Sequence, residues 1–131
     1  PIDHPLTKLH RPVRFIEALE YEYIGLTSDF ALERVVEEKA AEAGLTPRIR
    51  MRVGFYATAR LLVTTGVGFT IQPAGCVPAD FSGAMLELDE TWSLRELKLC
   101  VRKETLRAKP EVGLLIESLK ENSSERQNRR N

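Results

Sequence analysis

The stretch TTGVGFTIQPAG, residues 64–75, places two glycines one residue apart beside an apolar run. A glycine-rich turn that cradles phosphate follows a strand and opens a helix, because the N–H groups of the helix then face the phosphate. Here Gly66 follows a helical pattern and Gly68 leads into a strand pattern, while Ile71 stands where the third glycine of a dinucleotide fingerprint would fall. The stretch is therefore predicted to be a turn from a helix to a strand, not a phosphate cradle.

Strand and helix patterns alternate around this turn, which is typical of an α/β fold. Aromatic and β-branched runs of strand type alternate with segments that carry apolar residues at helical spacing. The predicted strands cover residues 21–26, 45–53 and 67–72, and the predicted helices cover residues 27–44 and 55–66. Before them, residues 1–12 contain three prolines and are predicted to be extended, and residues 13–20 are predicted to include one short helical turn.

The helix patterns predict which side chains face the core. In the first helix one face carries Leu32, Val35, Val36, Ala40 and Ala43, and the opposite face carries Glu33, Arg34, Glu37, Glu38 and Glu42. In the second helix Ala57, Leu61 and Leu62 are predicted to point inward. Thr27 or Ser28 could cap the start of the first helix, and Gly44 and Gly66 are expected to end the two helices.

The remainder of the chain departs from simple alternation. A short strand is predicted at residues 84–88, and a half-exposed strand is predicted where Leu97, Leu99 and Val101 alternate with polar residues and Cys100. Residues 110–121 begin with a proline and predict a helix with one apolar stripe, formed by Val112, Leu115, Ile116 and Leu119. Residues 122–131 are polar and are predicted to form a disordered tail.

Composition excludes several classes of protein. Nineteen basic residues balance nineteen acidic ones, so the chain has no electrostatic footprint for nucleic acid or an anionic membrane. No apolar run approaches the roughly 20 residues of a membrane span, and no signal peptide precedes the first element. Cys76 and Cys100 are too few for a disulfide scaffold, so a reduced, cytoplasmic protein of one domain is expected.

The order of elements, together with several local strings, resembles the effector-binding domain of LysR-type transcriptional regulators. Residues 21–75 look like the second half of that domain, in which a strand and a helix end in residues similar to "AAGLGIALLP", written here as TTGVGFTIQP. Residues 86–119 resemble the closing strand, basic residue, proline and final helix of the family, and DHPL at residues 3–6 resembles the "HPL" before its second subdomain. The resemblance extends over nearly all of residues 3–120.

The resemblance implies a fold like that of type II periplasmic binding proteins, with one complete Rossmann-like subdomain plus the C-terminal strand and helix of the second lobe. Residues 1–12 would be a remnant of lobe I, residues 13–97 the effector-binding subdomain II, and residues 98–121 the return strand and helix of lobe I. The family's helix-turn-helix domain does not occur in this sequence. DNA would therefore be contacted only through a domain outside this chain.

Ligands of open α/β sheets lie beyond the carboxyl ends of strands, where helix N-termini offer N–H donors. Two such junctions are predicted, at residues 26–29 and 53–57. Thr27 and Ser28 would supply hydroxyls, Gly54 would let a ligand approach the backbone, and Phe55 and Tyr56 would form a wall. The alternatives are helix capping for the two hydroxyls and core or dimer packing for the two rings. The family's hinge strand, by resemblance, adds Leu99 near the cleft.

Three classes of function remain open at this point. A small-molecule sensor of a transcriptional regulator is the leading one; a solute-binding domain of a transport system and a small α/β enzyme are the alternatives. No nucleophile, base and orienting group converge at strand ends, and His4 and His10 have no metal ligands at suitable spacing. We therefore expect no catalytic residue, metal or cofactor. The expected partners are a small organic effector and further copies of the chain, as a dimer or higher homo-oligomer, with no membrane.

Overall fold

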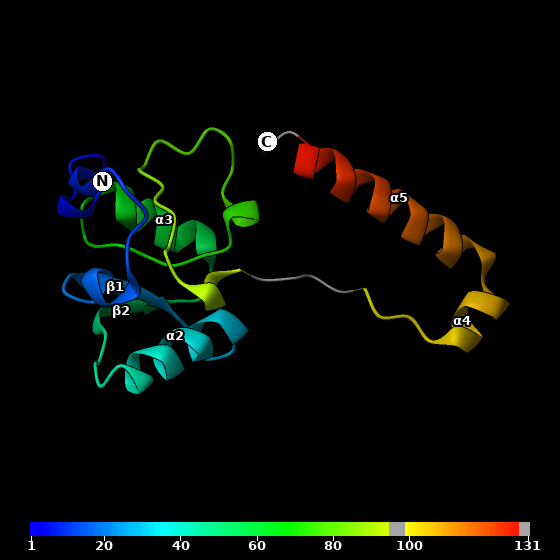
Figure 1. Cartoon of the computed structure of the whole chain (residues 1–131), viewed down its shortest axis with the longest axis horizontal. Helices are drawn as coiled ribbons and strands as arrows, with labels where there is room; N and C mark the ends of the chain where they lie inside the picture. Colours follow the sequence, from blue (N-terminus) through cyan, green and yellow to red (C-terminus); the bar gives the residue numbers. More distant parts are fainter. Residues whose placement is uncertain (95–98, 129–131) are drawn as a thin grey trace. The chain divides into compact units, whose positions relative to one another are not determined.

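A computed structural model describes residues 1–94 and 99–128, with the backbone alone for residues 106–108 and 121–128. The chain divides into two compact units, residues 1–94 and residues 95–131 (Figure 1). The first unit holds the sheet and its covering helices, and the described residues of the second unit hold two helices. Each unit is described by itself.

The first unit is built on two parallel strands, β1 (Glu22–Leu26) and β2 (Arg48–Val53). Their pairing runs from Glu22 opposite Arg48 to Leu26 opposite Val53, with one irregularity after Tyr23, where β2 contributes an extra residue. Both strands occur where the sequence predicted them. β1 is almost wholly buried, whereas β2 is largely exposed.

The predicted third strand, residues 67–72, is reduced to a single parallel bridge between Phe69 and Tyr23. Phe69 accepts a hydrogen bond from the Ile24 N–H (2.8 Å) and donates one to the Glu22 carbonyl (3.0 Å). It therefore lies on the edge of β1 opposite to β2. The predicted strand at residues 84–88 is likewise reduced to one bridge, between Leu88 and Val13.

Helices α2 (Ala31–Glu42) and α3 (Tyr56–Thr64) cover opposite faces of the strand pair (Figure 1). Successive side chains of a strand point to opposite faces, so Tyr23 packs with α2 while Ile24 and Leu26 pack with α3. Two hydrophobic clusters result. The α2 cluster contains Phe15, Leu19, Tyr23, Leu32, Val36 and Ala40, and the α3 cluster contains Ile24, Leu26, Ala59 and Val63.

The helix ends confirm one expectation and correct another. Gly44 and Gly66 follow the two helices with φ of 69° and 83°, the left-handed conformation that glycine adopts without strain, so the predicted ends are confirmed. Thr27 and Ser28 do not cap α2, because Phe30 occupies the N-cap position and no side chain caps the helix. The chain first makes a turn in which the Phe30 N–H bonds to the Thr27 carbonyl (3.1 Å).

The predicted helix faces were partly wrong. On α2, Leu32, Val36 and Ala40 are buried as expected, but Ala43 is exposed and Glu33, assigned to the solvent face, is 1% exposed. On α3 the buried residues are Ala59 and Val63, whereas Ala57 and Leu61 are exposed. The α3 sequence is apolar on several sides, so periodicity alone did not decide which side faces the sheet.

The opening segment is not wholly extended as predicted. Residues Pro5–Leu9 form a 3-10 helix, η1, in which the His4 ring accepts a hydrogen bond from the Leu6 N–H. The predicted helical turn that follows is confirmed as α1 (Phe15–Ala18). Two further short 3-10 turns, η2 (Ala74–Cys76) and η3 (Thr91–Ser93), lie in the turn-rich return of the chain.

The second unit contains α4 (Lys103–Ala108), which the sequence did not predict, and α5 (Pro110–Asn128). The helix predicted at residues 110–121 is confirmed, and it runs on through residues that polar composition assigned to a disordered tail. Leu99, Cys100 and Val101, predicted to lie in a strand, are irregular. The beginning of that predicted strand, including Leu97, lies outside the described residues.

Candidate functional site

The two predicted junctions lie side by side at the carboxyl ends of β1 and β2. The Thr27 N–H donates to the Val53 carbonyl (3.1 Å), which extends the pairing of the strands one residue beyond Leu26. From this point one chain segment leads into α2 and the other into α3. The structure thus places Thr27 beside Val53, the residue that precedes Gly54.

Each predicted site residue has a distinct environment. Thr27 is half-buried, Ser28 and Gly54 are exposed, and Phe55 is 72% exposed. Tyr56 is half-buried and meets the ring of Phe30 edge-on, with centroids 5.3 Å apart, so it serves the packing of α3 as well as the surface of the junction. Leu99 belongs to the second unit, where it is exposed.

The N-termini of α2 and α3 supply the polar groups of this edge. Neither helix has a side-chain cap; the first turn of α2 contains Glu33, whereas the first turn of α3 contains no acidic residue. Backbone N–H groups at a helix start favour oxygen ligands with negative charge, through both hydrogen bonding and the helix dipole. The start of α3 therefore offers N–H donors of the kind that suit carboxylate or hydroxyl oxygens.

A third segment, which was not predicted as part of the site, lies along β1 on the side opposite to β2. β1 has β2 on one side and the Phe69 segment on the other. The chain therefore continues from β1 to one side of the sheet and later returns to the other side. Ligands of open α/β sheets commonly bind at such a change of direction. Directly after Phe69, the Thr70 hydroxyl donates to the Ile24 carbonyl (2.9 Å), and Arg60 donates to the Gln72 side chain (2.8 Å). The signal was present, because Thr70 and Gln72 are polar residues within the strand predicted at residues 67–72.

A buried carboxylate lies behind these junctions. Glu33 Oε2 accepts hydrogen bonds from the Tyr23 hydroxyl (2.8 Å) and the Leu26 N–H (3.0 Å), and Glu33 Oε1 lies 3.1 Å from Arg52 Nη1. Burial, followed by the charge and hydrogen bond of Glu33, raises the pKa of Tyr23 far above its usual value. The tyrosine is therefore a hydrogen-bond donor at any ordinary pH.

Arg52 connects this carboxylate to the rest of the edge. It donates to the Leu26 carbonyl (3.0 Å) and to Glu37 on the next turn of α2 (2.5 Å). The hydrogen bond to Glu37 is the main cause that raises the pKa of Arg52, so its charge is permanent. Glu33 was predicted to face solvent. Arg52, a charged residue within a predicted strand, was the signal that an acidic residue could be buried beside it.

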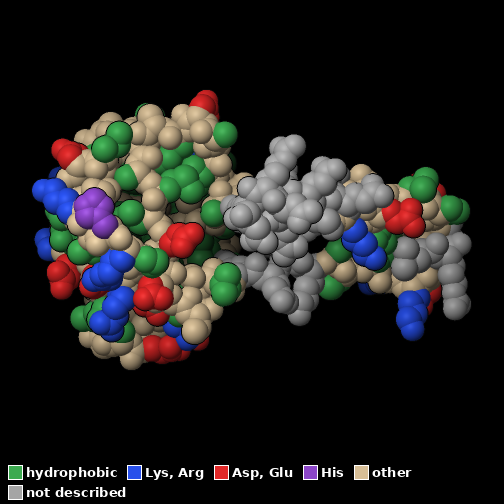
Figure 2. Space-filling model, turned by 45° about the horizontal axis from the view of Figure 1, so that its top comes forward, with side chains coloured by type: hydrophobic (Ala, Val, Ile, Leu, Met, Phe, Trp, Pro, Cys, Tyr) green, Lys and Arg blue, Asp and Glu red, His purple; other side chains and the backbone are tan. Residues whose placement is uncertain are grey.

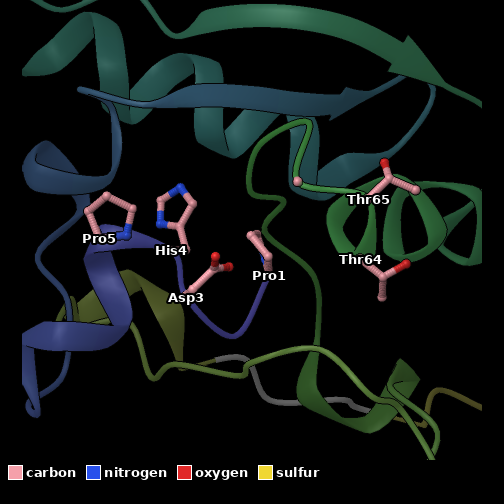
Figure 3. A pocket seen from close by; sticks show the side chains of 7 residues that line it. Pro1, Asp3, His4, Pro5, Thr64 and Thr65 are labelled. Carbon is pink, nitrogen blue, oxygen red and sulfur yellow. The ribbon is translucent and has the colours of Figure 1, made fainter.

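A separate hollow of about 460 Å³ lies at the other end of α3 (Figure 3). Asp3 and His4 of the opening segment line one side, and Thr64 and Thr65 line the other. Burial lowers the pKa of His4, so its ring is neutral near pH 7. Because α3 runs back from the carboxyl end of β2, this hollow is remote from the two junctions.

Other sites are not supported within the described residues. No group of three or more histidine, cysteine or acidic side chains there could hold a metal ion, and no helix in that part of the chain is long and apolar enough to cross a membrane. Cys76 and Cys100 are free and exposed. On the face of the first unit seen in Figure 2, basic and acidic side chains are interspersed and form no patch of one sign.

The fold and the paired strand-to-helix junctions define an α/β ligand-binding domain. The family model of the LysR substrate binding domain matches residues 1–124. The chain therefore belongs to the LysR substrate-binding domain family, a family of regulatory domains and not of enzymes. No curated protein matches the chain.

A solved structure supports the mixed α/β fold. The effector binding domain of QuiR in complex with shikimate superimposes with a TM-score of 0.61 at 24% sequence identity. The match covers 68% of this chain and 42% of the QuiR chain. The present chain thus matches less than half of the length of that structure.

Proposed function

We propose that this chain is part of the effector-sensing domain of a LysR-type transcriptional regulator, and that a small organic molecule binds at residues 26–29 and 53–57. The observation that carries the proposal is the hydrogen bond from Thr27 to Val53, which places two uncapped helix N-termini side by side. Binding there would favour one arrangement of the lobes over another and so change the activity of an attached DNA-binding domain.

The finer organisation is part of the proposal. Residues 13–97 would form one Rossmann-like subdomain, while residues 1–12 and 98–121 would belong to a second lobe. DNA would be contacted through a helix-turn-helix domain outside this chain, and the regulator would act in the cytoplasm as a dimer or higher homo-oligomer. Exposed leucines on α5, at positions 114, 115 and 119, support association.

The chemistry of the edge favours an effector with a carboxylate and hydroxyl groups. The QuiR domain is described in complex with shikimate, which is such a compound. Isothermal calorimetry should therefore compare shikimate with its methyl ester, which keeps the ring and hydroxyls but lacks the charge. Binding of shikimate with a clear loss for the ester supports an anion at the helix N-termini. Equal affinity for both compounds would contradict that role of the junctions.

A further inference from the structure

Leu26, the last residue of β1, lies opposite Val53 of β2, but its own N–H and carbonyl form hydrogen bonds with side chains. The Leu26 N–H donates to Glu33 Oε2 (3.0 Å), and the Leu26 carbonyl accepts from Arg52 Nη1 (3.0 Å). The same arginine nitrogen lies 3.1 Å from Glu33 Oε1, which closes a ring of hydrogen bonds around this residue. Both polar backbone groups of Leu26 are thus satisfied by one ion pair.

The reason lies in the interrupted pairing on the other edge of β1. Phe69 bridges Tyr23, but the next residue, Thr70, already bonds to the Ile24 carbonyl through its side chain. In the described part of the chain, no strand bridge on that edge lies beyond Phe69. Buried backbone groups need partners, and the side chains of Glu33 and Arg52 supply them at Leu26.

We propose that Glu33 and Arg52 are positioning residues of the effector site: Glu33 holds the Leu26 N–H, Arg52 holds the Leu26 carbonyl, and together they set the direction in which the chain continues to Thr27. The proposal rests on the proposed function. Arg52 holds the carbonyl of the Leu26–Thr27 peptide, and Val53 holds its N–H at 3.1 Å. The peptide is therefore held on both sides, which fixes the backbone position of Thr27 and of the turn after it before ligand arrives.

Two further observations explain why this pair can act as a rigid support. Glu33 is 1% exposed and lies in the first turn of α2, where the helix dipole favours a carboxylate. Glu37 holds the second guanidinium nitrogen of Arg52 at 2.5 Å. The guanidinium is thus fixed by two carboxylates and a carbonyl, a geometry that a lysine ammonium cannot reproduce.

The test compares Arg52→Lys with Arg48→Lys in the 131-residue chain. Arg48 is a matched control, because it lies on the same strand and also bonds one carbonyl, of Glu20, and one carboxylate, of Glu22. Tyr23→Phe serves as a stability reference, because it removes one hydrogen bond to Glu33 Oε2 but leaves the bonds of Arg52 to the Leu26 carbonyl and to Glu33 in place. NMR measures amide hydrogen exchange at Leu26 and Thr27, and calorimetry measures affinity for shikimate.

We expect Arg52→Lys to speed exchange of both amides and to weaken shikimate binding, each by about tenfold. Arg48→Lys should leave both quantities within about twofold, and Tyr23→Phe should lower the melting temperature without a change in exchange at Thr27, because Arg52 still holds the Leu26 carbonyl. If Arg52→Lys does not fold, the exposed-site variant Glu37→Ala releases one side of Arg52 and should shift both quantities in the same direction.

The proposal is overturned if exchange at Leu26 and Thr27 in Arg52→Lys matches that in Arg48→Lys, or if affinity only follows stability as in Tyr23→Phe. Failure of the proposed function would give a different set of results. In that case the wild-type chain binds neither shikimate nor its ester, while the exchange measurement still decides whether Glu33 and Arg52 fix the junction.

Discussion

A Cβ atom on Gly25 would lie 2.7 Å from Glu33 Oε1, closer than side-chain carbons approach other atoms. Gly25 occupies the middle of β1, where glycine normally weakens a strand. Its presence is explained by the carboxylate that lies against the backbone, because Glu33 could not otherwise reach Leu26 and Arg52 at once. The close approach of Gly25 and Glu33 is thus a condition for the ion pair between Glu33 and Arg52.

Gly25→Ala is therefore expected to destabilise the fold. The added methyl must displace a buried carboxylate that is held on both oxygens, and overpacking of this kind costs about 1–3 kcal/mol. Gly75→Ala is the control, because a Cβ there meets open space and should change the free energy of unfolding by no more than about 0.5 kcal/mol. Chemical denaturation of both variants decides the matter. Equal stability would mean that Glu33 can move aside without loss.

A pH-dependent contribution is expected from Glu17. Its hydrogen bonds to Arg11, then to the Arg14 N–H, lower its pKa from 4.5 to about 2. A depressed carboxylate pKa stabilises the fold above the unfolded value, and this stabilisation is lost as the pH falls from about 4.5 to about 2. Glu17→Gln should therefore melt below the wild type at pH 7 and together with it near pH 2.

Salt provides the control for this prediction. Arg11 is exposed and Glu17 is half-buried, so water and ions reach this pair and screen its interaction. At about 1 M salt the difference in melting temperature at pH 7 should shrink. A difference between wild type and variant that stays constant from pH 7 to pH 2 would show that packing of α1, and not the carboxylate charge, is responsible.

The order of elements could be predicted from the sequence because it depends on local periodicity and on glycine. The ranges of β1, β2, α2 and α3 follow from apolar spacing, and Gly44 and Gly66 end the helices where the backbone needs positive φ. The two junctions followed from this order, since carboxyl ends of parallel strands meet at one edge. Family membership was predicted from the same strings and is confirmed.

The remainder depends on tertiary contacts that periodicity does not describe. Glu33 occupies a helix position that reads as solvent-facing, yet it is buried because Arg52, nineteen residues away in sequence, neutralises it. The strand at residues 67–72 has the right composition but pairs at only one residue, because Thr70 replaces a backbone bond with its hydroxyl. Whether a side chain or a backbone group bonds to a given carbonyl depends on contacts between segments that are distant in sequence, and local periodicity does not describe these contacts.

Thr27→Val separates the two roles that the sequence left open for this hydroxyl. A capping threonine would contribute about 0.5–2 kcal/mol to stability. Phe30 holds the N-cap position, so the free energy of unfolding should change by less than about 0.5 kcal/mol. Affinity for the effector should fall about 2- to 10-fold, as expected for one lost neutral hydrogen bond. Calorimetry and denaturation measure the two quantities.

Thr64→Val is the matched control for Thr27→Val. Its hydroxyl is exposed and bonds to the Leu61 carbonyl within α3, at the end of the helix remote from the junctions. Affinity should be unchanged in this variant. A loss of affinity in Thr64→Val equal to that in Thr27→Val would place the ligand elsewhere, and the hollow beside Thr64 and His4 would be the alternative.

Association is the last expectation, and it follows from the surface of α5. Leu114, Leu115 and Leu119 are 69%, 58% and 47% exposed, and Val112 and Ile116 on the same helix are half-buried. Burying one such leucine is worth about 1.5–3 kcal/mol, so a few of them suffice to drive association. At micromolar concentration the chain should form a dimer or a higher oligomer, as light scattering can measure.

The double variant Leu115→Lys, Leu119→Lys should shift this chain toward the monomer, because charge on the apolar stripe opposes its burial. Glu117→Lys is the control, since it adds a lysine to an exposed position of the same helix without removing an apolar side chain. The control should associate like the wild type. A wild-type monomer in which Leu115 and Ile116 are protected from solvent would contradict this account, because the chain would then bury its own stripe.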